Sequence, residues 1–175
     1  MDAAGVAKVV NCPAIWDPAS NDYAVEAARR HPDRFATLGW FRLEADASED
    51  SIDRLLDQPG MLGLRFMLAT PDLWPRFEAG ELDWLFAAAG RRELAFGVML
   101  PAPGLELLGR IAASNPGLRL IVDHLAVSPF EKLPGAFAHL DSLVALAVHP
   151  NIAVKATAVP SMSNESYPFA DTFGA

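Results

Sequence analysis

Short apolar runs alternate with amphipathic segments along this chain. Each run is mostly apolar at successive positions, which is typical of strands that are buried on both faces of a parallel sheet. The runs recur every 25–35 residues or so, roughly the spacing that leaves room for one helix between consecutive strands. Six strands are predicted on this basis, at residues 7–12, 35–41, 63–67, 94–100, 118–123 and 152–156.

Helix signals fill the segments between these strands. Asn21 is predicted to cap the first helix, which ends near His31, and Ser48 is predicted to cap the second. Two acidic residues follow Ser48 in the first turn, where the helix dipole favours negative charge. The second helix stops at residues 59–60, and further helices are predicted at about residues 82–90, 105–113 and 137–147.

This strand–helix rhythm defines an α/β fold with right-handed crossovers. An open doubly wound sheet and a closed (β/α)₈ barrel share the same rhythm, so the pattern alone leaves both open. No glycine-rich phosphate loop follows any predicted strand. The nucleotide-binding type of open sheet is therefore disfavoured.

Composition and charge narrow the classes of partner. The 175 residues carry a formal net charge of −8 and no basic stripe, which argues against binding to nucleic acid or anionic membranes. The single cysteine, Cys12, excludes an intrachain disulfide and is interpreted as a small core residue. We find neither a signal-peptide pattern nor an apolar run that is long enough to span a membrane. We expect a soluble, cytoplasmic protein.

Polar residues at the carboxyl ends of the predicted strands are the candidates for chemistry, because sites gather there in barrels and open sheets alike. His124 directly follows a buried strand, where an imidazole can accept a proton or polarise a carbonyl. The alternative is a histidine that is satisfied by a backbone carbonyl. The complete set of strand-end candidates is Asn11, Cys12, Arg42, Arg65, Asp123, His124, Lys155 and Thr157.

Two cations lie within or next to these apolar strands. Arg65 must be paired, because an unpaired buried charge is costly, and its partner is either a substrate carboxylate or a barrel carboxylate. Lys155 is either a pocket cation or an ion-pair partner of Asp123. His31, His139 and His149 are expected to be solvated, and no Cys/His cluster has metal-ligand spacing.

Several segments, taken in order, resemble the amidohydrolase-related family, which is also called the amidohydrolase 2 family. The resemblance implies a TIM barrel of the metal-dependent hydrolase superfamily. Under it, residues 1–175 form a single domain of six consecutive β/α units, a partial (β/α)₈ barrel with the first and last strands missing. The segments that carry the resemblance are residues 1–6, 21–35, 59–65, 121–125 and 149–155.

The resemblance also implies roles for individual residues. His124 matches the histidine of the sixth barrel strand, and Arg65 matches an arginine that holds a substrate carboxylate in the lactonase branch, which includes the pyrone-dicarboxylate hydrolases. Met99 stands where metal-binding members carry a histidine, and a thioether is a poor ligand for such ions. The family's His-x-His pair and last-strand aspartate have no counterpart. We therefore expect no metal in this chain and a zinc-like divalent ion only in a longer parent.

The expected function is hydrolysis of a small carboxylated substrate such as a lactone. His124 is the predicted catalytic residue, and Arg65 and Lys155 are the predicted substrate-binding residues. With the end strands missing, little or no activity is expected of the chain itself. The alternatives are a decarboxylase of the same family and a non-catalytic barrel fragment. Such a fragment binds a partner or forms a homo-oligomer through its exposed strand edges.

Overall fold

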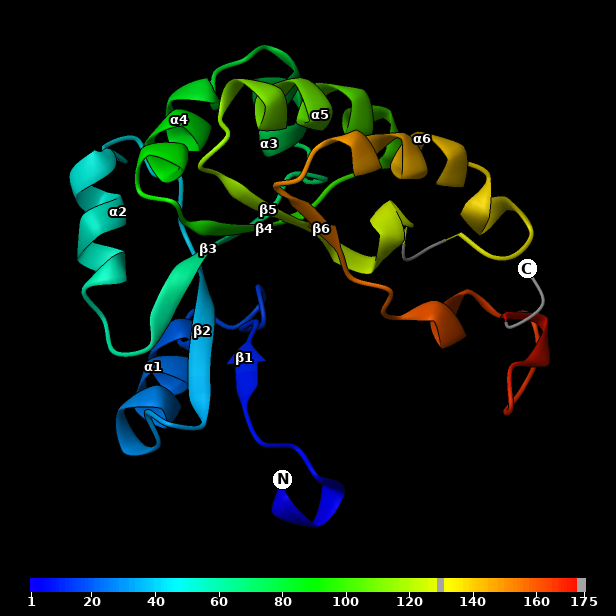
Figure 1. The fold of residues 1–175 in the computed structure, drawn as a ribbon, viewed down its shortest axis with the longest axis horizontal. Helices are drawn as coiled ribbons and strands as arrows, with labels where there is room; N and C mark the ends of the chain where they lie inside the picture. The colour runs from blue at the N-terminus through cyan, green and yellow to red at the C-terminus, as the bar shows by residue number, and fades with distance from the viewer. Residues whose placement is uncertain (129–130, 173–175) are drawn as a thin grey trace.

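The computed structural model describes residues 1–128 and 131–172, and the remaining residues of the predicted 1–175 domain lie outside the described part. Six parallel strands pair in sequence order within one sheet. The sheet is curled, and helices cover its convex side (Figure 1). This arrangement confirms the predicted partial (β/α)₈ barrel of six units. The strands are β1 (Val9–Asn11), β2 (Phe35–Trp40), β3 (Met61–Met67), β4 (Ala95–Met99), β5 (Arg119–Val122) and β6 (Ile152–Val154).

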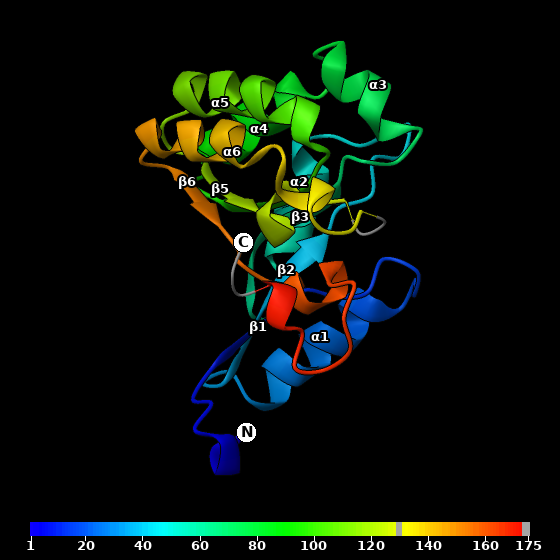
Figure 2. The same cartoon turned by 90° about the vertical axis from the view of Figure 1, so that its right-hand side faces the viewer.

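The helices lie outside the sheet, and Figure 2 shows α3 to α6 gathered on one side of it. No helix within residues 1–128 and 131–172 is long and apolar enough to cross a membrane. The helices are α1 (Ser20–Arg30), α2 (Glu49–Leu56), α3 (Leu73–Glu78), α4 (Asp83–Arg91), α5 (Leu105–Ser114) and α6 (Leu140–Ala145).

Three helix predictions differ from the structure. Asn21 lies inside α1, and its side chain bonds the backbone of Trp40 in both directions, at 2.9 and 3.0 Å, so it docks the helix on β2 and caps nothing. Helix α3 was not predicted; it contains Pro75, which lies in the first turn, where a missing N–H costs little. The helix predicted at residues 137–147 is shorter, and 3₁₀ turns flank it. Ser48 is confirmed as the N-cap of α2.

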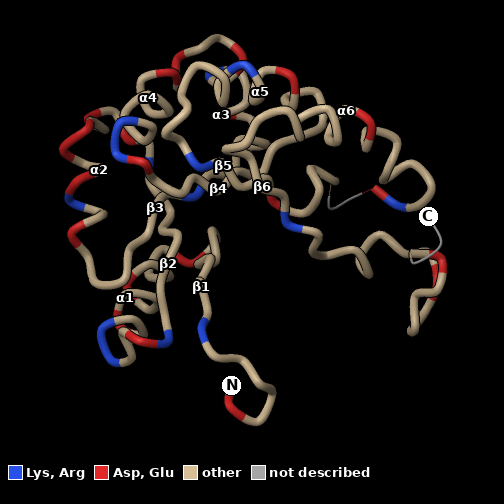
Figure 3. The backbone as a smooth tube through the Cα atoms, in the orientation of Figure 1, with Lys and Arg blue, Asp and Glu red and all other residues tan. Residues whose placement is uncertain are grey.

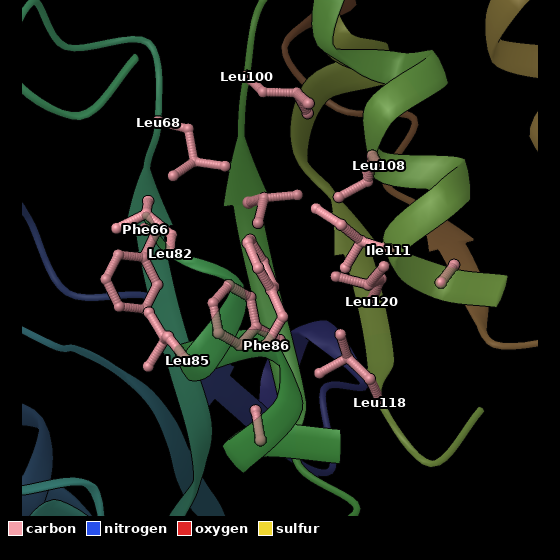
Figure 4. Close-up of a cluster of buried hydrophobic side chains, with 14 of the residues drawn as sticks. Phe66, Leu68, Leu82, Leu85, Phe86, Leu100, Leu108, Ile111, Leu118 and Leu120 are labelled. Atoms are coloured by element: carbon pink, nitrogen blue, oxygen red, sulfur yellow. The ribbon is translucent and has the colours of Figure 1, made fainter. Parts of the chain in front are cut away.

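The core lies between the convex face of the sheet and the helices. Phe66 of β3 and Phe96 of β4 stack at 5.0 Å between ring centroids, and Phe86 of α4 packs on Phe96 at 4.9 Å. Figure 4 shows Leu108 and Ile111 of α5 completing this layer beside Leu118 and Leu120. Because side chains alternate along a strand, the intervening residues face the concave side of the sheet.

We expect Phe96→Ala to destabilise the protein by about 3–5 kcal/mol, because it removes the ring shared by both aromatic contacts and leaves a cavity. Urea unfolding followed by circular dichroism measures this loss. Val144→Ala on α6 is the control, since Val144 is 69% exposed and its truncation is expected to change stability little. Equal losses in the two variants would contradict this placement of the core.

Candidate active site

The concave face carries a buried ion pair between strands that are not neighbours. Arg65 extends from β3 and donates from Nε and Nη2 to Oδ2 of Asp123, at 3.0 and 2.8 Å. Strand β4 lies between them, and the residue paired with Arg65 on it is Gly97. A Cβ at Gly97 would lie 3.4 Å from Cγ of Arg65. A methyl group there would already touch Arg65, so a larger side chain at Gly97 would obstruct the path of the guanidinium across β4 to the end of β5.

Lys155 completes the charge cluster from the next strand. Its ammonium lies 2.8 Å from Oδ1 of Asp123, as an ion pair without hydrogen-bond alignment. The Asp123 side chain has no exposed surface, whereas those of Arg65 and Lys155 are 10% and 30% exposed. Both carboxylate oxygens thus face cations, and the open side of the cluster presents N–H donors.

Two further side chains frame these cations. The guanidinium carbon of Arg65 lies 4.7 Å from the ring centroid of Trp40, on β2, in a cation–π contact that also fixes the plane of the guanidinium. On the other side, Lys155 donates to Sγ of Cys12 at 3.4 Å. The segments that follow the two edge strands, β1 and β6, therefore meet at this cluster.

His124 follows Asp123 and is held by a separate contact. A hydrogen bond of 2.7 Å joins Nδ1 of His124 to Oγ1 of Thr157, two residues after Lys155. No other described residue makes a hydrogen bond to Nε2 of His124. The imidazole is thus oriented through one nitrogen, and the other is available to a ligand.

The backbone from His124 to Ala126 adopts an energetically unfavourable conformation. His124, Leu125 and Ala126 have φ values of 53°, 56° and 56°, in the left-handed region that non-glycine residues rarely adopt. Leu125 donates its N–H to the carbonyl of Lys155 at 3.1 Å, and the Leu125 carbonyl accepts from Nε2 of His139 at 2.8 Å. Strain held by surrounding contacts is typical of functional sites, so the turn supports a role for His124.

The structure brings the predicted substrate-binding residues, Arg65 and Lys155, together on Asp123, and places His124 next to Asp123 in the chain. The core assignment of Cys12 is wrong, because Cys12 is exposed beside Lys155. His139 is half-buried at the start of α6 and not solvated, since it supports the strained turn. Trp40 was missed, although its alternation with Leu38 on β2 places it on the concave face.

The space beside the cluster is small and open. A cavity of about 170 Å³ adjoins Trp40 and is also lined by Arg42 and Met67 at the ends of β2 and β3. Ligand pockets usually hold about 300–1,000 Å³. A larger cavity of about 460 Å³ lies between α5 and α6, away from the strand ends. Neither cavity is lined by Arg65, Asp123 or Lys155, and the Lys155 side chain is partly open to solvent.

The sequence model of the amidohydrolase family matches residues 1–174. An L-fucono-1,5-lactonase from Burkholderia ambifaria is 27% identical over 153 residues, which cover 86% of this chain and 52% of the relative. The chain thus spans about half the length of this curated relative.

Solved structures show the same fold at low identity. A probable 2-pyrone-4,6-dicarboxylic acid hydrolase from Acinetobacter baumannii, with citric acid bound, aligns with a TM-score of 0.68 at 13% identity, covering 98% of this chain and 61% of its own. A zinc-bound amidohydrolase from Burkholderia multivorans aligns with a TM-score of 0.75 at 16% identity, covering 99% and 64%.

The zinc in that similar structure raises the question of a metal site here. Within residues 1–128 and 131–172, no group of three His, Cys, Asp or Glu side chains lies close enough to hold a metal ion. Both oxygens of Asp123 already face cations, and Met99 at the end of β4 offers only a thioether. The described residues therefore do not fit a divalent metal by themselves.

We expect Arg65→Met to destabilise the protein by about 3–5 kcal/mol, because it leaves the buried Asp123 with one cation in place of two. Equilibrium urea unfolding is the measurement. Arg110→Met, which removes an exposed ion pair with Glu106 on α5, is the control and is expected to cost far less. Similar losses for both variants would show that the Arg65 pair is not buried as described.

The left-handed turn predicts opposite responses to two alanine-to-glycine changes. Glycine adopts positive φ without strain, so Ala126→Gly is expected to retain or raise stability, whereas Ala112→Gly inside α5 is expected to lose about 1 kcal/mol. Both alanines are buried, so each variant loses a comparable methyl contact. Thermal unfolding of the two variants tests this, and equal destabilisation would argue against the strained turn.

Proposed function

The chain belongs to the amidohydrolase family, and on that premise we propose that it serves the hydrolysis of a small lactone that carries a carboxylate. The observation that carries this proposal is the pair of cations on one buried carboxylate, with donors left on the open side. The lactonase among its relatives supports a lactone as the substrate class.

Arg65 and Lys155 are the proposed substrate-binding residues. Nε and Nη2 of Arg65 are engaged by Asp123, and no described acceptor contacts Nη1. Lys155 has three N–H donors, of which Asp123 and Cys12 face two. One free edge of a guanidinium and one free ammonium donor suit a carboxylate, which accepts two charge-assisted hydrogen bonds.

His124 is the proposed catalytic residue. In ring opening, a water oxygen adds to the lactone carbonyl carbon, the bond from that carbon to the ring oxygen breaks, and the departing oxygen takes a proton. Nε2 of His124 polarises the carbonyl or orients the water, while Thr157 holds Nδ1. Both oxygens of Asp123 face cations and are not free to contact a water, so we expect slow turnover by the chain alone.

The γ-lactone of α-hydroxyglutarate and γ-butyrolactone form a matched pair of probes, since only the first carries a carboxylate. We expect the chain to bind the carboxylated lactone about tenfold more tightly or better, because of its charge-assisted contacts. Isothermal titration calorimetry measures both affinities, and Arg65→Met is expected to abolish the difference. Arg119→Met, at the opposite, exposed end of the sheet, is the control and is expected to preserve it.

Turnover is followed with the same lactones by proton release. Rates at or barely above those of buffer are expected, and rapid turnover would contradict the description of Asp123 as fully engaged by its two cations. Release of carbon dioxide without ring opening would support a decarboxylase instead. Equal affinity for the two lactones in the unmodified chain would contradict the proposed function.

A further inference from the structure

The charges of the cluster do not cancel. Arg65 and Lys155 each carry one positive charge, and Asp123 carries one negative charge between them. The formal sum is one positive charge on a face where the Asp123 carboxylate is fully buried. Arg42, near the small cavity, is exposed, so water screens its charge and it adds little to this balance.

One positive charge has a consequence for the ligand. A ligand with one carboxylate brings the site to neutrality, whereas a ligand with two carboxylates leaves an uncompensated negative charge in a partly buried place. Because the Arg65 side chain is only 10% exposed, a carboxylate that binds it loses part of its hydration, and the cluster has no third cation to compensate a second carboxylate for the same loss. The site is therefore matched to a monoanion and mismatched to a dianion.

We propose that Asp123 is the specificity-determining residue of this site, because it offsets one of two cations and so selects substrates with one carboxylate. This inference rests on the proposed function. Hydrolysis of a monocarboxylate lactone creates a second carboxylate, so the product is a dianion. The same charge balance that favours binding of the substrate lowers the affinity for the product and so favours product release.

Asp123 also positions the side chains of the two cations, Arg65 and Lys155. It fixes the plane of Arg65 through two bonds to one oxygen and draws Lys155 to the other, so the free donors of both cations are set before a ligand arrives. Asparagine in its place retains one carbonyl oxygen as an acceptor for Arg65 and removes the negative charge. The substitution thus keeps the contact with Arg65, while the amide N–H₂ group that faces Lys155 no longer attracts the ammonium.

The test uses the γ-lactone of α-hydroxyglutarate, a monoanion at neutral pH, and open-chain α-hydroxyglutarate, a dianion with the same carbon skeleton. Calorimetry at fixed ionic strength gives the ratio of their affinities. In the unmodified chain the monoanion is expected to bind about tenfold more tightly. In Asp123→Asn the ratio is expected to fall to one or to invert, because the site then carries two positive charges.

Lys155→Met provides a second, independent change at a partly exposed position. It reduces the formal charge of the cluster to zero, so affinity for the monoanion is expected to fall about tenfold while the dianion remains the weaker ligand. This variant keeps the inference testable if Asp123→Asn does not fold. An unchanged affinity for the monoanion in Lys155→Met would contradict the charge balance.

The outcomes separate the two proposals. If Arg65→Met leaves lactone binding unchanged, the proposed function fails and the inference fails with it. The second outcome is that Arg65→Met abolishes binding while Asp123→Asn leaves the ratio of the affinities for monoanion and dianion within about twofold of that of the unmodified chain. In that case only the role of Asp123 in specificity fails.

Discussion

A carboxylate without exposed surface is the constraint on which the concave face of this sheet depends. Burying the charge of Asp123 is unfavourable unless cations and hydrogen bonds compensate for it. Arg65 from β3 and Lys155 after β6 supply that compensation from both sides. Arg65 lies on β3, and Asp123 and Lys155 directly follow β5 and β6, so their attraction joins these three strands across the inner side of the curl. The same contacts set the geometry of the candidate site.

Two local features follow from this constraint. The guanidinium can reach Asp123 only by passing over β4, and Gly97 leaves that passage open. Beyond Asp123 the chain turns through three left-handed residues. The turn is tied to Lys155 by a backbone hydrogen bond and to His139 by a hydrogen bond from the imidazole. The turn places His124 within reach of Thr157, so the ion pair and the oriented imidazole belong to one connected structure.

The sequence predicted the sheet better than it predicted the site. Strands buried on both faces leave continuous apolar runs, and five of the six predicted runs contain an observed strand, while the run at 63–67 lies within β3. Helix α3 was not predicted, and the proline that it contains suits a loop as well as a first helical turn. Alternation shows which face a residue occupies but not which partner it finds. The pairing of Arg65 and Lys155 with Asp123 therefore stayed one of two alternatives until the strands were placed in space.

A buried ion pair is a weak means of stabilising a fold, because apolar side chains of similar volume do as well or better. Stability alone therefore gives little reason for the Arg65, Asp123 and Lys155 cluster at this place. The geometry of the cluster is better explained as a preorganised arrangement of charges that can bind a ligand. The stacking on Trp40 fixes the guanidinium plane, and the ammonium of Lys155 is partly open to solvent. Donors held in this way lose little freedom when a carboxylate binds, so more of the interaction energy is available for affinity.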